Sequence, residues 1–149
     1  MVERSVDVRL IDALEGLVFE AVGLTATALA EFAPATDLTL PQWRALVIVT
    51  RADGIRIGEV GGRMGMALPS ASRLIRRLER RGLVATERDA RDRRATIARP
   101  TPAGIELSAG LAAHRRRMIG EILDRLVAPL QPELATDLEL VGDALGEYR

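Results

Sequence analysis

The sequence contains no cysteine and no lysine, and its 149 residues include a single histidine, a single tryptophan and a single tyrosine. The absence of cysteine excludes disulfides, thiol redox sensing and thiolate metal sites. His114 is the only imidazole, and no glycine-rich loop carries a lysine, so the chain lacks the residue clusters of a metal centre, a nucleophile–base pair or a phosphate-binding loop. We therefore expect no enzymatic activity, no metal and no cofactor.

Long apolar runs are also missing. No uninterrupted apolar stretch approaches the ~18 residues of a membrane span. The N-terminus, with Glu3, Arg4 and Asp7, lacks the basic start and apolar core of a signal peptide. We expect a cytoplasmic protein with no membrane partner, and the length suits one domain with its own hydrophobic core.

The net charge is zero, but arginine is concentrated in one part of the chain. Residues 56–99 hold twelve arginines and five acidic residues, whereas the rest of the chain holds nine arginines and sixteen acidic residues. A basic segment in an otherwise acidic chain favours the binding of a polyanion such as DNA in one orientation. The use of arginine for every basic position also reflects compositional bias, so the placement of the arginines counts for more than their number.

Residues 68–82 have the pattern of a short amphipathic helix. Its apolar positions fall at i, i+3, i+4 and i+7, which predicts one buried stripe; they are Ala71, Leu74, Ile75 and Leu78. Pro69 suits the first turn, and Gly82 suits the left-handed position that follows a helix. Hydroxyl and guanidinium groups remain for the outward face, where they suit contacts with base edges and phosphates in a DNA major groove. These outward candidates are Ser70, Ser72, Arg73, Arg76 and Arg77.

The next segment predicts a β-hairpin with a charged tip. Residues 83–88 and 95–99 have the composition of two short strands, and residues 89–94 lie between them. The tip arginines Arg91, Arg93 and Arg94 are suited to phosphates and to a narrow minor groove. The alternative interpretation is a solvated surface on which the arginines pair with Glu79, Glu87, Asp89 and Asp92. A helix, a glycine and a charged hairpin in unbroken order favour the DNA interpretation.

Three motifs give this region a resemblance to a known family. They are Arg-Leu-Ile-Arg-Arg-Leu-Glu-Arg-Arg-Gly-Leu-Val at residues 73–84, Asp-Ala-Arg-Asp-Arg-Arg at residues 89–94, and Thr-Pro-Ala-Gly at residues 101–104. In this order and spacing they resemble the winged-helix signature of the MarR family of bacterial transcription regulators. The resemblance implies a mainly α fold with a small β wing, in which a winged helix-turn-helix is flanked by N- and C-terminal dimerisation helices. It also implies an obligate dimer and, often, repression relieved by a small ligand.

Carried over to this chain, the resemblance assigns roles and boundaries. Ser70, Ser72, Arg73 and Arg77 would face the major groove, Arg94 would serve the wing, and Asp92 would orient the wing arginines. Residues 1–149 would form a single protomer. Within it, residues 36–100 would form the DNA-binding region, and residues 1–33 and 101–149 the helical dimerisation region.

The remaining elements are predicted from periodicity and caps. Apolar repeats predict helices over residues 6–32, from 40 to about 51, from 102 to about 128, and 134–145. Thr39 and Thr101 are candidate caps before first-turn prolines. Residues 55–57 suit a short strand that pairs with the wing, and residues 58–65 suit a short first helix of a helix-turn-helix, which Gly65 would end.

The two end helical regions carry more apolar surface than a chain of this length readily covers. We therefore expect them to pack against a second protomer, with an intramolecular bundle as the alternative. A two-fold dimer with recognition helices about 34 Å apart would bind a palindromic operator in double-stranded DNA.

A small aromatic or phenolic effector is a further hypothesis, because a ligand between the dimer region and the DNA-binding region would alter the spacing of the recognition helices. The candidate lining residues are Phe19, Phe32, Trp43, His114 and Arg115. A regulator with no effector is the alternative for the ligand. The alternative for the whole chain is a helical interaction module whose basic segment binds an acidic protein.

Overall fold

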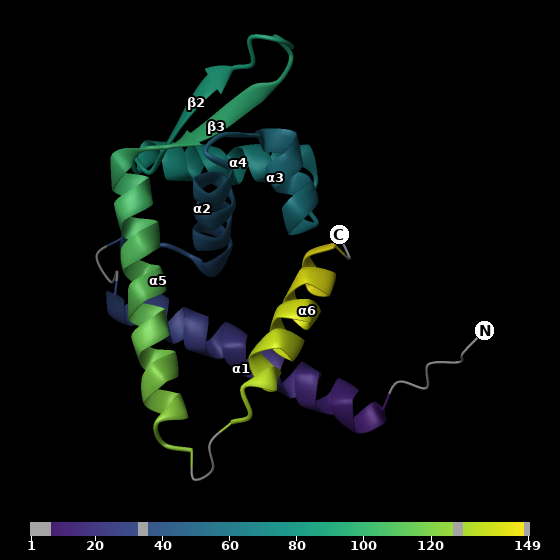
Figure 1. Ribbon diagram of the computed structural model, residues 1–149. Helices are drawn as coiled ribbons and strands as arrows, with labels where there is room; N and C mark the ends of the chain where they lie inside the picture. The colour runs from purple at the N-terminus through teal and green to yellow at the C-terminus, as the bar shows by residue number, and fades with distance from the viewer. Residues whose placement is uncertain (1–6, 33–35, 127–129, 148–149) are drawn as a thin grey trace, which may run out of the picture.

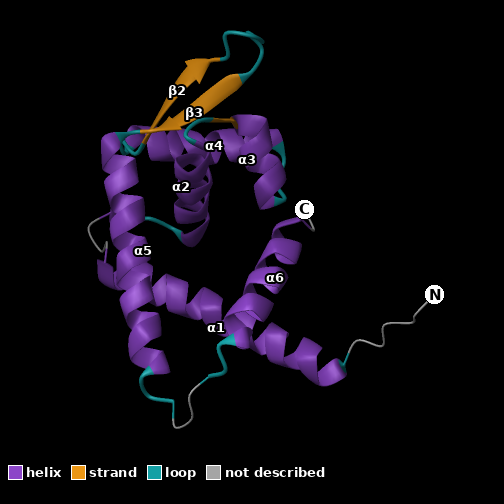
Figure 2. Cartoon of the chain, viewed as in Figure 1, coloured by secondary structure: helices purple, strands orange, loops and turns teal. Residues whose placement is uncertain are grey.

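The computed structural model describes residues 7–32, 36–126 and 130–147. The helices and strands follow one another as α1 (Val8–Phe32), α2 (Leu40–Ala52), β1 (Ile55–Arg56), α3 (Ile57–Met64), α4 (Leu68–Arg80), β2 (Val84–Arg88), β3 (Thr96–Pro100), α5 (Pro102–Leu123) and α6 (Glu133–Glu147). In Figure 1 the short helices α2, α3 and α4 gather beneath the β2–β3 hairpin, while α1, α6 and the far half of α5 form a separate helical part. The mainly α fold with a small β wing is as predicted (Figure 2).

The strands form one antiparallel sheet in the order β1-β3-β2. Ile55 pairs with Ala98 and Arg56 pairs with Ile97, so the predicted pairing of this segment with the wing is confirmed. Ile57, which was expected to extend the strand, instead begins α3 and is buried in the core. The predicted hairpin is also confirmed, with β2 and β3 each starting one residue later than the composition indicated.

The core beneath the hairpin is built from the apolar faces of α2, α3 and α4. The predicted stripe of α4 is buried in full, and it packs among Leu46 and Val49 of α2 and Val60 of α3. Leu111 brings α5 into the same cluster. Because close-packed apolar contacts fix side chains in position, this cluster sets the direction in which the opposite face of α4 points.

Turns and caps fix the ends of these helices. Gly65 and Gly82 have φ angles of 66° and 68°, in the left-handed region that glycine adopts without strain, and for Gly82 this is the predicted conformation. The backbone N–H of Gly82 donates to the carbonyl of Glu79 at 2.9 Å, and this closes the last turn of α4. At the start of α5 the hydroxyl of Thr101 accepts the N–H of Gly104 at 3.1 Å and donates to the Gly82 carbonyl at 2.6 Å.

The end of α5 was predicted wrongly. The helix stops at Leu123, and residues 124–126 form a turn, although the apolar pattern continues to Leu126. Leu126 is 46% exposed, so no packing holds a further helical turn in place at this point. The predicted limits at Val6 for the first helix and Ala128 for this one lie outside the described residues.

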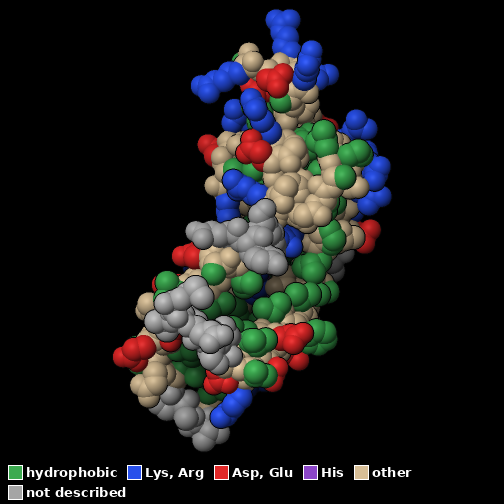
Figure 3. All heavy atoms as spheres, turned by 90° about the vertical axis from the view of Figure 1, so that its right-hand side faces the viewer, with side chains coloured by type: hydrophobic (Ala, Val, Ile, Leu, Met, Phe, Trp, Pro, Cys, Tyr) green, Lys and Arg blue, Asp and Glu red, His purple; other side chains and the backbone are tan. Residues whose placement is uncertain are grey.

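The helix α1 exposes most of its apolar side chains. Only Ala28 and Leu29 are buried along its 25 residues, while Leu17 and Val18 are about half exposed and Phe19 is 75% exposed. By length and composition α1 would be able to cross a membrane, with a mean hydropathy of 1.5 over an 18-residue window. Exposed apolar side chains also gather over the lower half of the molecule in Figure 3. An exposed apolar surface of this size is typical of a site that packs against another molecule.

The contact between Gly104 and the Leu83 carbonyl gives a test of the junction between the wing and α5. A Cβ at residue 104 would clash with that carbonyl oxygen, whereas a Cβ at Gly120, on the same helix, would meet no atom within 4 Å. We expect Gly104→Ala to lower the free energy of unfolding by ~1–3 kcal/mol, because a backbone carbonyl cannot move aside cheaply. Gly120→Ala should raise the free energy of unfolding by ~1 kcal/mol through helix propensity. Urea denaturation at equal protein concentration measures both, and a Gly104→Ala protein as stable as the wild type would contradict the packing described.

Candidate nucleic-acid interface

The outward face of α4 lies opposite its buried stripe. At 100° per residue, the side chains of Arg73, Arg76 and Arg80 project away from the core, with Arg77 toward α2 and Ser72 toward the wing. The four arginines are exposed, and Ser70 and Ser72 are half-buried. The guanidinium of Arg73 donates to the hydroxyl of Ser70 at 3.0 Å. Arg80, which was not among the candidates for the groove, shares this face and continues it by one turn.

The wing tip presents Arg91, Arg93 and Arg94 to solvent. Asp92 shapes the backbone of the tip: its carboxylate accepts the N–H of Arg94 at 3.0 Å, and its carbonyl accepts the N–H of Ala95 at 2.8 Å. In the described structure Asp92 therefore acts on the arginines through the backbone turn. Arg94 and Ser72 line one depression of about 330 Å³ between the wing and the start of α4.

The carboxylates of this region are bound to other partners. Glu79 accepts hydrogen bonds from the backbone and hydroxyl of Thr86, and Glu87 pairs with Arg99. Among the described residues the ion pairs here use Arg56, Arg81 and Arg99. The candidate arginines of α4 and the wing tip make none of them. The alternative therefore holds in part: Asp89 and Glu87 do pair with arginines, but these are Arg56 and Arg99. Figure 3 shows basic side chains projecting at the wing end of the molecule.

Arg56 and Asp89 form an ion pair at the base of the wing tip that the sequence did not predict. The Nε and Nη2 atoms of Arg56 lie 2.8 and 2.6 Å from Oδ2 of Asp89, and the N–H of Arg91 donates to Oδ1 at 2.8 Å. The Arg91 N–H and then the Arg56 guanidinium lower the pKa of Asp89, and hydrogen bonding to Asp89 raises the pKa of Arg56. The two residues are 33 positions apart, and only the strand register brings them together.

Arg81 joins the end of α4 to the start of α2. Its guanidinium donates to the carbonyl of Asp37 at 2.9 Å and to the side-chain oxygen of Gln42, which is buried, at 3.2 Å. Gln42 also accepts the N–H of Thr39 at 3.0 Å, across the first turn of α2. The position of α4 is therefore fixed at its far end by hydrogen bonds as well as by apolar contacts.

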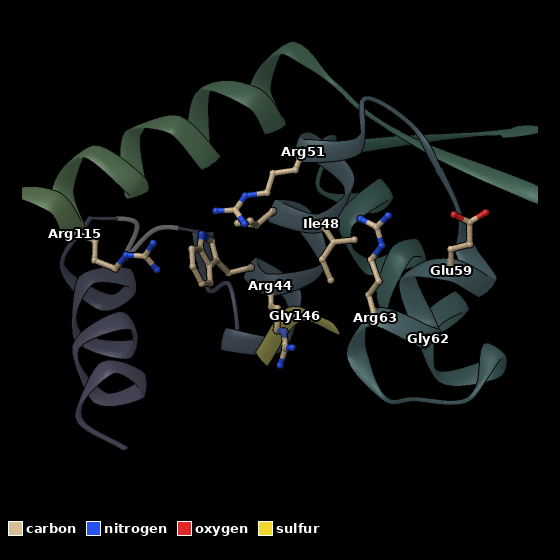
Figure 4. A pocket seen from close by; sticks show the side chains of 10 residues that line it. Arg44, Ile48, Arg51, Glu59, Gly62, Arg63, Arg115 and Gly146 are labelled. Atoms are coloured by element: carbon tan, nitrogen blue, oxygen red, sulfur yellow. The ribbon is translucent and has the colours of Figure 1, made fainter. Parts of the chain in front are cut away.

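A cavity of about 720 Å³ lies between the helices α2 and α3 on one side and α5 and α6 on the other (Figure 4). Its lining comes from α2, α3, α5 and the end of α6, and comprises Trp43, Arg44, Val47, Ile48, Arg51, Glu59, Gly62, Arg63, Arg115 and Gly146. Arg51 and Arg115 point toward one another in Figure 4, and among the described side chains Glu59 is the one carboxylate in the lining. Partial burial, with the nearby Arg51 and Arg116, lowers the pKa of Arg115. The cavity is suited to an anion.

Two candidate ligand residues meet at this cavity. The guanidinium carbon of Arg115 lies 5.2 Å from the centroid of the Trp43 ring, a cation–π distance. Trp43 is 9% exposed, as expected for a core residue, and its Nε1–H is buried with no hydrogen-bond partner among the described residues. A buried donor of this kind is costly unless a ligand or water accepts its hydrogen bond.

The other three candidates lie elsewhere. Phe32 and His114 lie together at the contact between α1 and α5, with ring centroids 5.7 Å apart and the rings tilted by 34°. Nε2 of His114 lies 3.2 Å from Oε2 of Glu31. Phe19 is exposed on α1. The structure thus places Trp43 with Arg115 and Phe32 with His114, in two separate pairs that leave Phe19 apart.

Comparisons with known proteins agree with this architecture. A family model described as MarR family matches residues 36–95. The structure of RV1404 from Mycobacterium tuberculosis is 26% identical, covers 97% of each chain and superposes with a TM-score of 0.82. FabT from Streptococcus pneumoniae, solved in complex with DNA, is 17% identical over 95% of this chain and 98% of its own, with a TM-score of 0.74. NadR in complex with 4-hydroxyphenylacetate is 19% identical over 100% of this chain and 97% of its own, with a TM-score of 0.69. No curated protein matches the sequence.

Proposed function

We propose that this protein, which belongs to the MarR family, is a DNA-binding transcriptional regulator that acts as a homodimeric repressor on a palindromic operator. One observation carries the proposal: the arginines of the outward face of α4 and of the wing tip lie on adjoining surfaces and are free of ion pairs among the described residues. Unpaired guanidinium groups on a rigid scaffold suit the phosphates and base edges of a duplex. FabT, which has the same fold, was solved with DNA.

In this proposal α4 enters the major groove and the wing follows the backbone beside it. Arg73 and Arg77 supply base-edge or phosphate contacts, and a bidentate arginine–guanine pair is worth ~1–3 kcal/mol of discrimination between bases. Ser70 orients Arg73 through the hydrogen bond between their side chains. The wing arginines contribute attraction to phosphates and to the minor groove.

The second protomer supplies the cover that the apolar helices lack. Side chains of α1, α5 and α6 that are about 40% to 75% exposed include Leu17, Phe19, Ile122 and Leu140. Their burial against a second copy would give the large apolar interface typical of obligate dimers. A two-fold axis through this interface would place the two recognition helices in successive major grooves.

The arginine-lined cavity is the proposed site of a small aromatic acid that releases the operator. It is bounded by α2 and α3 of the DNA-binding region and by α5 and α6 of the outer helices, so its occupant would alter how the two parts pack. Arg115 and Arg51 suit a carboxylate, and Trp43 suits an aromatic ring. NadR, a protein of the same fold, was solved with 4-hydroxyphenylacetate.

The DNA interface is tested by Arg94→Ala, with Arg116→Ala on α5 as the matched control. Affinity for the DNA upstream of the gene should fall for Arg94→Ala. The slope of the logarithm of the DNA association constant against the logarithm of the salt concentration should become less negative by about 2, because a dimer loses two phosphate contacts. Arg116→Ala should leave both quantities unchanged. Fluorescence anisotropy at several salt concentrations measures them.

Failure of the wild type to bind this DNA at low salt, together with capture of an acidic protein, would favour the interaction-module alternative.

Dimerisation is tested by a double substitution, Leu17→Glu with Val18→Glu, on the exposed face of α1. The wild type should sediment at twice the chain mass of 16.2 kDa. The double variant should dissociate toward monomer and lose operator binding, because burying two carboxylates in an apolar interface is costly. The control Glu20→Gln, on the same helix, should remain dimeric. A wild type that sediments as a stable monomer would reject the dimer.

The ligand cavity is tested through Trp43, whose emission is unambiguous because the chain has one tryptophan. Titration with 4-hydroxyphenylacetate and benzoate should change this emission saturably and weaken operator binding, while neutral phenol should bind less well because it lacks the carboxylate. Arg115→Gln should raise the dissociation constants of the acids more than that of phenol. An unchanged emission and unchanged DNA affinity with both acids would count against an effector of this class.

A further inference from the structure

The wing extends past the edge of its own sheet. The strand β1 ends with the pair Arg56–Ile97, so the hairpin beyond Ile97 consists of two strands and the tip alone. Figure 1 shows this hairpin projecting away from the helices. An isolated two-stranded hairpin is only marginally stable in water, so its direction needs a further constraint.

The Arg56–Asp89 ion pair lies where the third strand ends. Arg56 is both the last residue of β1 and the N-cap of α3, and Asp89 is the first residue after β2. Both carboxylate oxygens are used: Oδ2 accepts two guanidinium nitrogens of Arg56, and Oδ1 accepts the N–H of Arg91 in the tip. One carboxylate thus connects the start of α3 to the backbone of the wing tip.

Burial of the carboxylate distinguishes this ion pair from the other one in the hairpin. The side chain of Asp89 is 8% exposed and that of Glu87 is 53% exposed, whereas the two arginines are similar, at 44% for Arg56 and 50% for Arg99. Exposed pairs contribute little, because water screens them and both side chains lose rotamer freedom. A buried carboxylate with three donors has a defined geometry, since loss of any donor leaves an oxygen poorly satisfied.

We propose that Arg56 and Asp89 are positioning residues that hold the wing tip at a fixed orientation relative to α4. This inference rests on the proposed DNA-binding function, because the orientation matters only when both surfaces meet one duplex. Arg56 acts through the wing arginines, and it touches no DNA itself. When Arg56 is replaced, α4 keeps its contacts with DNA, but the wing no longer has a fixed orientation relative to α4.

The test compares Arg56→Gln with Glu87→Gln, which removes the charge of the exposed pair in the same hairpin and leaves the hydrogen bond from Arg99 to the Asp53 carbonyl in place. Without DNA, hydrogen exchange at the Asp89 and Arg91 amides should quicken in Arg56→Gln, while exchange in the core of α4 stays unchanged. Glu87→Gln should leave both regions unchanged. On operator DNA, Arg56→Gln should lose the protection given by the wing and keep the major-groove protection given by α4. Arg56→Lys should restore part of the wing protection.

A double-mutant cycle separates positioning from direct contact. In a protein that carries Arg91→Ala, Arg93→Ala and Arg94→Ala, the further change Arg56→Gln should have almost no effect on affinity, because residues that act through one another are not additive. Additive losses of DNA affinity would mean that Arg56 contacts DNA itself, and would overturn the inference. Hydrogen exchange and a DNA footprint that are both unchanged in Arg56→Gln would overturn it as well. If the wild type binds no DNA, the proposed function fails, and the exchange experiment alone decides whether Arg56 holds the wing.

Discussion

Burial of one stripe on α4 is the constraint on which the rest of the interface depends. Ala71, Leu74, Ile75 and Leu78 occupy the centre of a core formed by α2, α3 and α5, and that packing leaves the helix no freedom to rotate. A rotation of one residue position would bring arginines into the core and apolar side chains into water. The cost of burying an unpaired guanidinium therefore sets which side chains face outward.

The acidic residues of the same region stabilise the fold without neutralising the charge of the outward arginines. Glu79 is held by the backbone and hydroxyl of Thr86, Asp92 by the backbone of the tip, and Asp89 by Arg56. Each carboxylate is satisfied by a partner that holds part of the fold in place. The net basic charge of residues 56–99 thus remains on the surface formed by α4 and the wing, where it attracts a polyanion.

The sequence predicted the features that depend on local rules. Periodicity located the buried stripe of α4, and backbone conformation required Gly65 and Gly82 at the ends of two helices. The end of α5 was missed because the apolar pattern runs on past Leu123 with nothing to pack against. The Arg56–Asp89 pair was missed because it depends on the register of β1 against β3. The cavity was predicted only in part: Trp43 and Arg115 meet there, but the guanidinium groups of α2 and α3 come together only when four helices pack.

The helix α3 connects the two sites that the fold creates. Its N-cap, Arg56, holds the wing tip through Asp89, and its body lines the cavity with Glu59, Gly62 and Arg63. The helix has eight residues and is about 12 Å long, so the cavity wall and the wing anchor lie close together on one element. Burial first, and then the guanidinium groups of Arg51 and Arg116, lower the pKa of Arg115, and an anion beside Arg115 would offset both effects. If the cavity takes an anion as proposed, its occupancy would be coupled to the wing through α3, because the same helix lines the cavity and carries Arg56 at its N-cap.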